Sequence, residues 1–371
     1  MKKYEFSIPM PYAKSQIDEI VDINNKLEKS KITSLYINLP VSCDMHTVFE
    51  QQRNIAYDLT DFQYWKELMH YGVTKGFEVI YLINSPRRME IEYPEKNYKD
   101  LRKLHQLLKE LNEIGVNKLR VSNPRLLSYL SRHYKNFDLY ASTSFEYKTL
   151  KEYVNFMAFH PTVKQIVPSH DINKNFKLLK NLRKSLPNLE IEIMANEGCM
   201  GGCPHRLEHS LTEFSRYVEG DDISLNTKYC SDLCGLFLYK YPFLFITKAS
   251  NIYPWEIEEY SKIGINKFKL VGREAHKGAG DSALDSYYNY LICIDDDKNL
   301  NDKLFNQLVH HIYYEEIYKI PVKEIRPYLP KIDYFKKHGH LCASECGVEC
   351  RYCYECAEKM ERKFHKKQEK S

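Results

Sequence analysis

Short apolar runs rich in β-branched and aromatic residues alternate with longer stretches of helical period from the N-terminus to about residue 292. This alternation is typical of βα units on a parallel sheet. Eight runs are predicted as strands: Ser34–Leu39, Glu78–Ile83, Lys118–Ser122, Phe137–Ser142, Gln165–Pro168, Leu189–Ala195, Leu244–Lys248 and Lys267–Gly272. Between them, Tyr98–Gly115 and Ile172–Leu186 have the apolar spacing of amphipathic helices.

Eight strands favour an α/β fold of the TIM-like (β/α)8 barrel class. An open doubly wound sheet fits the alternation almost as well. It usually has a glycine-rich phosphate loop after its first strand, however, and Leu39–Cys43 is not such a loop.

The alternation stops near Asn299, where a helical segment, Asp302–Ile317, is followed by three prolines and a cysteine-rich tail. We therefore expect two parts, a barrel over residues 1–298 and a C-terminal helical, cysteine-rich appendage over 299–371. The end of the chain, Lys359–Ser371, is basic, and a solvated helix end is favoured there over an RNA contact.

Active sites of such barrels form at the carboxyl ends of the strands. Polar residues follow the predicted strands in this chain: Asn38, Asn84, Asn123, Thr143, His170, Asn196, Glu197, Lys248, Arg273 and Glu274. The alternative is that they are turn formers, as polar residues at strand ends often are.

Composition adds few constraints beyond the cysteines. Charged residues make up 28% of the chain and the net charge is +4. The overall electrostatic potential therefore does not indicate a nucleic acid or a membrane as partner. The sequence contains no apolar stretch of membrane-spanning length and no signal-peptide pattern at Met1–Glu5. We therefore expect a soluble, cytoplasmic protein with no membrane span.

Eleven cysteines are many for a compartment that keeps thiols reduced, so metal binding is the leading explanation. Cys199 and Cys203 form one C-x3-C pair, and Cys230 and Cys234 form a second. Four thiolates suit tetrahedral zinc or a four-iron cluster. The Cys203-Pro204 step favours iron–sulfur, and Gly201 and Gly202 are expected to leave backbone amides free to approach cluster sulfurs.

Two further motifs carry metal chemistry. His205 to His209 spells H-x-x-E-H, the pattern of a zinc peptidase helix, but it starts directly after two cluster-spaced cysteines. A role in binding substrate or supporting the cluster is therefore preferred for His205 and Arg206, because a guanidinium suits an anionic substrate.

The tail holds five more cysteines: Cys342, Cys346, Cys350, Cys353 and Cys356. Their spacing includes the C-x3-C-x2-C of radical-SAM enzymes, which place it after the first barrel strand rather than near the end of the chain. We expect a second Fe–S cluster or a zinc site here, with redox-active or free thiols as the alternative.

The chain resembles the collagenase-like peptidase family U32. The resemblance rests on the Asn196–Pro204 loop, the Cys230 and Cys234 pair, and the block Ile263–Arg273, which resembles the family's Gly-Arg strand. It implies a TIM-like barrel with a four-cysteine [4Fe–4S] site. Family members include oxygen-independent ubiquinone and RNA hydroxylation proteins, for which prephenate is the implied oxygen donor, while the peptidase label comes from older members.

The cysteine spacing departs from the common family pattern, which has six residues between its first two ligands. One branch instead takes a ligand from the end of the first strand, a place that Cys43 matches here. If the chain follows that branch, Cys43 takes the place of Cys199 or Cys203 beside Cys230 and Cys234; if not, the four ligands are Cys199, Cys203, Cys230 and Cys234.

Three functions follow. The first is oxygen-independent hydroxylation or related redox chemistry on a small molecule or RNA, with Arg206, Arg273 and His205 as catalytic candidates. The second is a peptidase. The third is a non-catalytic, cluster-bearing partner subunit of a heterodimer with a related barrel protein.

Overall fold

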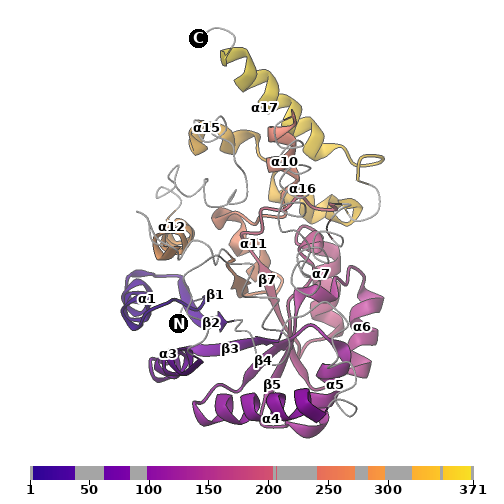
Figure 1. Ribbon diagram of the computed structural model, residues 1–371. Coiled ribbons are helices and arrows are strands. Elements are labelled where there is room, and N and C mark those ends of the chain that lie inside the picture. Colours follow the sequence, from indigo (N-terminus) through magenta and orange to yellow (C-terminus); the bar gives the residue numbers. More distant parts are fainter. Residues whose placement is uncertain are drawn as a thin grey trace, which may run out of the picture.

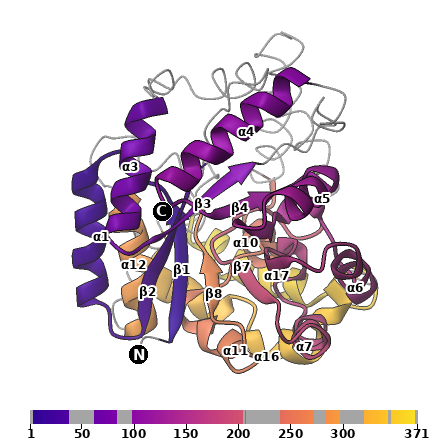
Figure 2. The same ribbon diagram turned by 90° about the horizontal axis from the view of Figure 1, so that it is seen from below.

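The computed structural model describes residues 3–37, 62–83, 98–203, 206, 240–271, 283–296, 320–342 and 346–368. Eight parallel strands close into a barrel in sequence order (Figures 1 and 2). They are β1 (Tyr4–Pro9), β2 (Ser30–Ile37), β3 (Glu78–Ile83), β4 (Lys118–Val121), β5 (Asp138–Ala141), β6 (Val163–Ile166), β7 (Glu190–Met194) and β8 (Lys267–Lys269). The predicted TIM-like (β/α)8 class is confirmed, because β1 pairs with both β2 and β8.

Helices surround the barrel, with α1 (Lys14–Lys26) and α3 (Phe62–Thr74) on one side and α6 (Leu150–Phe159) and α7 (Phe176–Ser185) on the opposite side (Figure 2). The remaining helices beside the strands are α4 (Tyr98–Glu113), α5 (Pro124–His133), α11 (Ile257–Ser261) and α12 (Ala283–Asp295). The two helices expected from periodicity, at Tyr98–Gly115 and Ile172–Leu186, correspond to α4 and α7.

Side-chain caps set where these helices begin. The Asn123 side chain accepts hydrogen bonds from the amides of Arg125 and Leu126 at the start of α5. At α6, Thr149 and Glu152 form a reciprocal capping box. Asn123 follows β4, so this strand-end polar residue acts as a turn former and cap.

Two strand assignments made from the sequence are wrong. Leu244–Lys248 lies in a helix, α10 (Pro242–Lys248), and the true first strand, Tyr4–Pro9, is missing from the prediction. A short apolar run has no decisive period, and proline at the first helical position favours the helix. The loop that carries Cys199 consequently follows the seventh strand, and Cys43 comes after the second.

The barrel interior contains a charged pair within a largely apolar core. A small apolar cluster of Tyr36, Ile80, Leu82 and Tyr140 is separate from the larger core between barrel and helices. Arg120 on β4, which is fully buried, donates through Nη2 to Glu192 Oε2 on β7 at 2.5 Å. The same nitrogen donates to Gln165 Oε1 on β6 at 2.5 Å, so one guanidinium links three strands.

The appendage packs on the barrel around α10. Its elements are α15 (Val322–Ile325), the 3-10 turn η7 (Arg326–Tyr328), α16 (Ile332–His338), the 3-10 turn η8 (Gly339–Cys342) and α17 (Tyr352–Gln368). Helix α17 lies against α10 (Figure 1), with the Phe243 and Phe364 rings 5.8 Å apart. The predicted helix Asp302–Ile317 lies outside the described residues. None of the described helices is long and apolar enough to cross a membrane.

Candidate functional site

The loop after β7 carries Cys199 and Cys203 at the carboxyl end of the barrel. Backbone hydrogen bonds hold it against the segment that follows α10: Gly201 donates to the Lys248 carbonyl at 2.8 Å, and Ser250 donates to the Cys199 carbonyl at 3.0 Å. The Ile252 amide donates to the Ala195 carbonyl at 2.7 Å, just after the end of β7. The position of both cysteines is therefore set by main-chain pairing.

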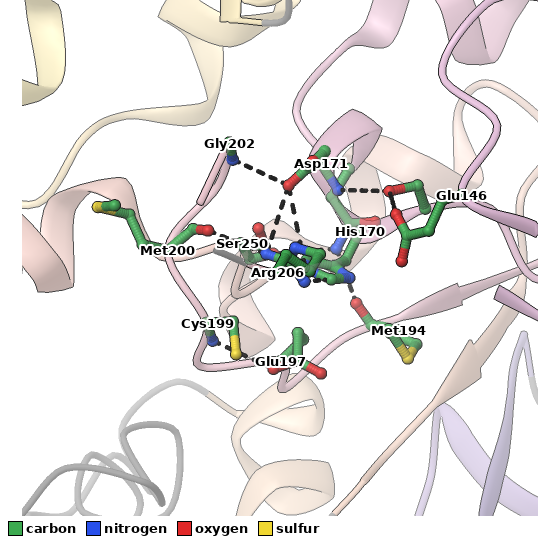
Figure 3. Close-up of polar contacts among 12 residues, drawn as sticks. Glu146, His170, Asp171, Met194, Glu197, Cys199, Met200, Gly202, Arg206 and Ser250 are labelled. Atoms are coloured by element: carbon green, nitrogen blue, oxygen red, sulfur yellow. Dashed lines mark hydrogen bonds and ion pairs between the residues drawn. The ribbon is translucent and has the colours of Figure 1, made fainter. Parts of the chain in front are cut away.

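Asp171, in the 3-10 turn η3 (His170–Ile172) after β6, ties this loop to the neighbouring strand end (Figure 3). Its Oδ1 accepts from the Gly202 amide at 2.9 Å, and its Oδ2 accepts from Lys148 Nζ at 2.6 Å. Burial would raise its pKa, but the bonds from Lys148 and Gly202 and the nearby Arg206 outweigh it, so the pKa of Asp171 lies below its usual value.

Arg206 lies between the loop and η3, where it contacts three protein groups (Figure 3). Its Nη1 is 3.0 Å from His170 Nδ1, its Nη2 donates to the Met200 carbonyl at 3.0 Å, and Asp171 Oδ1 is 3.5 Å away. Burial, with a smaller effect from Arg206, lowers the pKa of His170. The imidazole is therefore neutral near pH 7, and Nδ1 accepts from the guanidinium.

The predicted ligands of the central cluster are only partly described. Cys199 and Cys203 are both partly exposed, and the Cys199 amide donates to Glu197 Oε1 at 3.1 Å. The other predicted cofactor and catalytic residues outside the described part of the chain are Cys43, Cys230, Cys234, His205 and Arg273. The structure therefore brings together Cys199, Cys203 and Arg206 from the predicted set.

One expectation about this loop is wrong. Gly201 and Gly202 were expected to leave their amides free for cluster sulfurs, but these amides donate to the Lys248 carbonyl and to Asp171. The glycines serve the loop conformation instead. Gly202 has φ of +68°, which favours glycine, and a Cβ on Gly201 would lie 3.3 Å from the Lys248 carbonyl oxygen.

The tail cysteines lie on the segment beside α10 and α16, where Cys350 Sγ is 3.5 Å from Tyr334 Oη. Cys350 and Cys356 are buried, Cys342 and Cys353 are partly exposed, and Cys346 is exposed. Burial, with smaller contributions from the neighbouring thiols Cys350 and Cys346, raises the pKa of Cys342 to about 11 against the opposing charge of Lys174. Lys248 Nζ donates to Tyr354 Oη of α17 at 3.2 Å. The tail therefore contacts the residue whose carbonyl accepts from Gly201 of the Cys199 loop. Within the described residues, no three His, Cys, Asp or Glu side chains are arranged as a metal-binding group.

The sequence reasoning missed Asp171 and Lys148. Their signal was present, because Asp171 follows His170 at the end of a strand, and Lys148 precedes a capping box. Only the fold shows that both contact the loop of another strand.

We expect Asp171→Asn to lower the free energy of unfolding by about 1.5–3 kcal/mol, since it weakens charge-assisted hydrogen bonds to Lys148 and Gly202 and leaves Arg206 without its carboxylate. Chemical denaturation measures this. Asp138→Asn is the control: Asp138 pairs with the exposed Lys164, and a loss under about 1 kcal/mol is expected there. Equal losses in the two variants would contradict the role given to Asp171.

The fold and this loop define a TIM-like barrel with a cysteine pair at its carboxyl end, and the chain resembles the U32 peptidases. No known family model matches it. The chain is 23% identical over 352 residues to a protein of Methanocaldococcus jannaschii named Uncharacterized protease MJ1657, covering 93% of each chain.

Two solved structures are similar at lower identity. The U32 peptidase Mk0906 matches with a TM-score of 0.49 and 11% identity, over 76% of this chain and 94% of that one. The structure named CpGH84B matches with a TM-score of 0.36 and 13% identity, over 91% of this chain and 67% of that one.

Proposed function

We propose that this chain is an iron–sulfur protein of the U32 type, which supports oxygen-independent hydroxylation or related redox chemistry on a small molecule or RNA. Cys199 and Cys203 would hold a [4Fe–4S] cluster together with Cys230 and Cys234, or with Cys43 in place of one of the first pair. The supporting observation is the loop after β7, which holds two partly exposed thiols at the end of the barrel where active sites form.

The residues present suit such a cluster by their chemistry. Thiolates are the usual ligands of iron–sulfur clusters, and hydrogen bonds around the site tune them. Cys199 and Cys203 lie on one loop that is fixed on both sides, by Lys248 and by Asp171. A bound cluster would supply one-electron chemistry at the barrel mouth.

Arg206 and His170 would act as positioning residues. Arg206 joins the Met200 carbonyl to His170, so it holds the cysteine loop over the end of β6. Its positive charge lies beside the loop and favours an anionic group at the mouth. Arg273 and His205 are the other two catalytic candidates from the sequence.

Metal analysis of anaerobically purified protein tests this proposal. We expect a Cys199→Ala, Cys203→Ala double variant to lose about four irons and as much sulfide relative to the wild type. Cys293→Ala is the control, because Cys293 is buried in α12, in the core beside the barrel. Zinc without sulfide, or a double variant that keeps all the iron and sulfide of the wild type, would overturn the assignment of this pair.

The tail cysteines are proposed to hold a second iron–sulfur cluster or a zinc ion. Cys346 and Cys350 flank a tight turn in which Gly347 donates to the Cys350 carbonyl at 2.9 Å, with Gly347 at φ +90°. Metal that survives the loop variant but is lost in Cys350→Ala, Cys353→Ala would belong to the tail. Sulfide content then separates a cluster from zinc.

A peptidase is the second candidate, because the M. jannaschii relative is named a protease. Casein and gelatin hydrolysis by the purified protein, with and without a zinc chelator, tests it. Chelator-sensitive cleavage lost in His205→Ala would favour a zinc peptidase at the H-x-x-E-H motif. Protein with full iron content and no cleavage of either substrate would count against it.

A further inference from the structure

The short segment 248–250, at the end of α10, lies between the two sets of cysteines. On one side it pairs with the Cys199 loop, where Met200 and Ala249 form an antiparallel bridge with a main-chain hydrogen bond on each side of it. Ala249 and Ser250 are both buried. A shift of this segment would therefore shift the cysteine loop with it.

The side chain of Lys248 extends from this segment to the tail. Its Nζ donates to Tyr354 Oη of α17 and lies 4.9 Å from the centroid of that ring. Burial would lower the pKa of Lys248, but the nearby Cys346 and Tyr354 outweigh it, so the pKa lies above its usual value. A positive charge on the segment thus faces the tail cysteine Cys346.

Lys174 links the same segment to two other tail cysteines. It lies in the turn before α7, and its Nζ donates to the Ala249 carbonyl at 2.8 Å. Burial raises the pKa of Cys342 and of Cys353, and the charge of Lys174 opposes this effect at both thiols. Lys174 and Lys248 therefore join the segment to the thiols of the tail.

The charges of these two lysines match the charge that a metal site at the tail would carry. Cysteine binds metal as the thiolate, so loading converts neutral thiols into anions. Four thiolates around Zn²⁺, or around an oxidised four-iron core, leave a net charge of about −2. A buried charge needs paired cations, and Lys174 and Lys248 are placed to supply them.

We propose that metal bound at the tail cysteines holds the Cys199 loop in position through Lys174 and Lys248. The thiolates of the loaded site attract both ammonium groups, and the two lysines in turn hold segment 248–250. In the empty site the thiols are neutral and this attraction is weaker, so the loop opens more often. The inference rests on the proposed tail site, whichever metal it holds, and is independent of a cluster at Cys199.

Hydrogen exchange of the full-length protein, with metal content measured on the same samples, tests the proposal. The readout is exchange of the Gly201 and Ser250 amides, whose hydrogen bonds join the loop to the segment. We expect both amides to exchange about tenfold faster in the Cys350→Ala, Cys353→Ala variant than in the wild type, because the charge-assisted contacts of the lysines are lost. Strands β3 to β5 should exchange as in the wild type.

Lys248→Met separates the coupling from the folding of the tail. Lysine is not among the proposed ligands, so this variant should keep the tail metal and still exchange the loop amides about tenfold faster. Adding Lys248→Met to the cysteine variant should change little, since both break the same link. Lys363→Met, at an exposed position on α17, is the matched control and should behave like the wild type.

The outcomes distinguish the coupling from the tail site itself. Equal loop exchange with and without tail metal would overturn the coupling and leave the tail site standing. A wild-type protein that loses no metal in the Cys350→Ala, Cys353→Ala variant would overturn the tail site, and the coupling with it. Effects of Lys248→Met and of the cysteine variant that simply add would also overturn the coupling, because they would act on the loop independently.

Discussion

Glu192→Ala should lower the free energy of unfolding by about 3–5 kcal/mol, one of the two largest effects expected in this protein. Glu192 is the carboxylate partner of Arg120, whose residue is fully buried inside the barrel. Within the described structure, Arg120 Nε and Nη1 have no hydrogen-bond partner, so Nη2 carries all of its pairing. Removing Glu192 leaves a buried cation with Gln165 as its remaining acceptor.

Equilibrium denaturation measures this loss, and Glu190→Ala on the same strand is the matched control. Glu190 pairs with Lys267 at 3.0 Å and accepts from Gln165 Nε2 at 3.2 Å, and its side chain is 45% exposed, so a loss of about 1–2 kcal/mol, smaller than that of Glu192→Ala, is expected. A double variant, Arg120→Met with Glu192→Leu, should recover much of the stability because it removes both charges. A loss in Glu192→Ala no larger than in Glu190→Ala would show that the barrel interior is hydrated enough to screen the pair.

The barrel was predictable because its strands are buried on both faces and read as apolar runs between helices of clear period. The predicted total of eight strands was right only because two errors cancelled: the strand Tyr4–Pro9 was missed, and the helical segment Leu244–Lys248 was counted as a strand. The first lies before the first helix, where no earlier element marks a boundary. The second is a short apolar run, whose helical state follows from Pro242 and from packing against α17.

The site was predictable only where neighbouring residues carry it. The Cys199 and Cys203 pair is visible as a spacing, and the structure places it at the end of a strand as expected. The Asp171 network is not visible in the sequence, because Lys148, Asp171 and Gly202 lie on three separate loops that only barrel closure brings together. Arg206 was expected to face a substrate, and its protein contacts could not be read from its position beside the cysteines.

Gly339→Ala should separate the appendage from the barrel. A Cβ on Gly339 would lie 1.8 Å from the Lys174 carbonyl oxygen and 3.4 Å from Asn175 Cα. These are backbone atoms of the turn before α7, so no side-chain rotation relieves the contact and the two parts must move apart. Overpacking of this kind costs about 1–3 kcal/mol, and this contact is closer than most.

The expected result is faster hydrogen exchange in α16 and α17, with little change in strands β3 to β5, because the clash acts at the junction and not in the barrel. A shift of Lys174 would disturb both parts, because its Nζ donates to the Ala249 carbonyl at 2.8 Å and lies 4.8 Å from the Phe335 ring centroid in α16. Lys337→Ala, at an exposed position two residues earlier, is the control and should exchange like the wild type. Unchanged protection of α17 in Gly339→Ala would mean that the appendage is held by α10 alone, and that η8 is free to shift without affecting it.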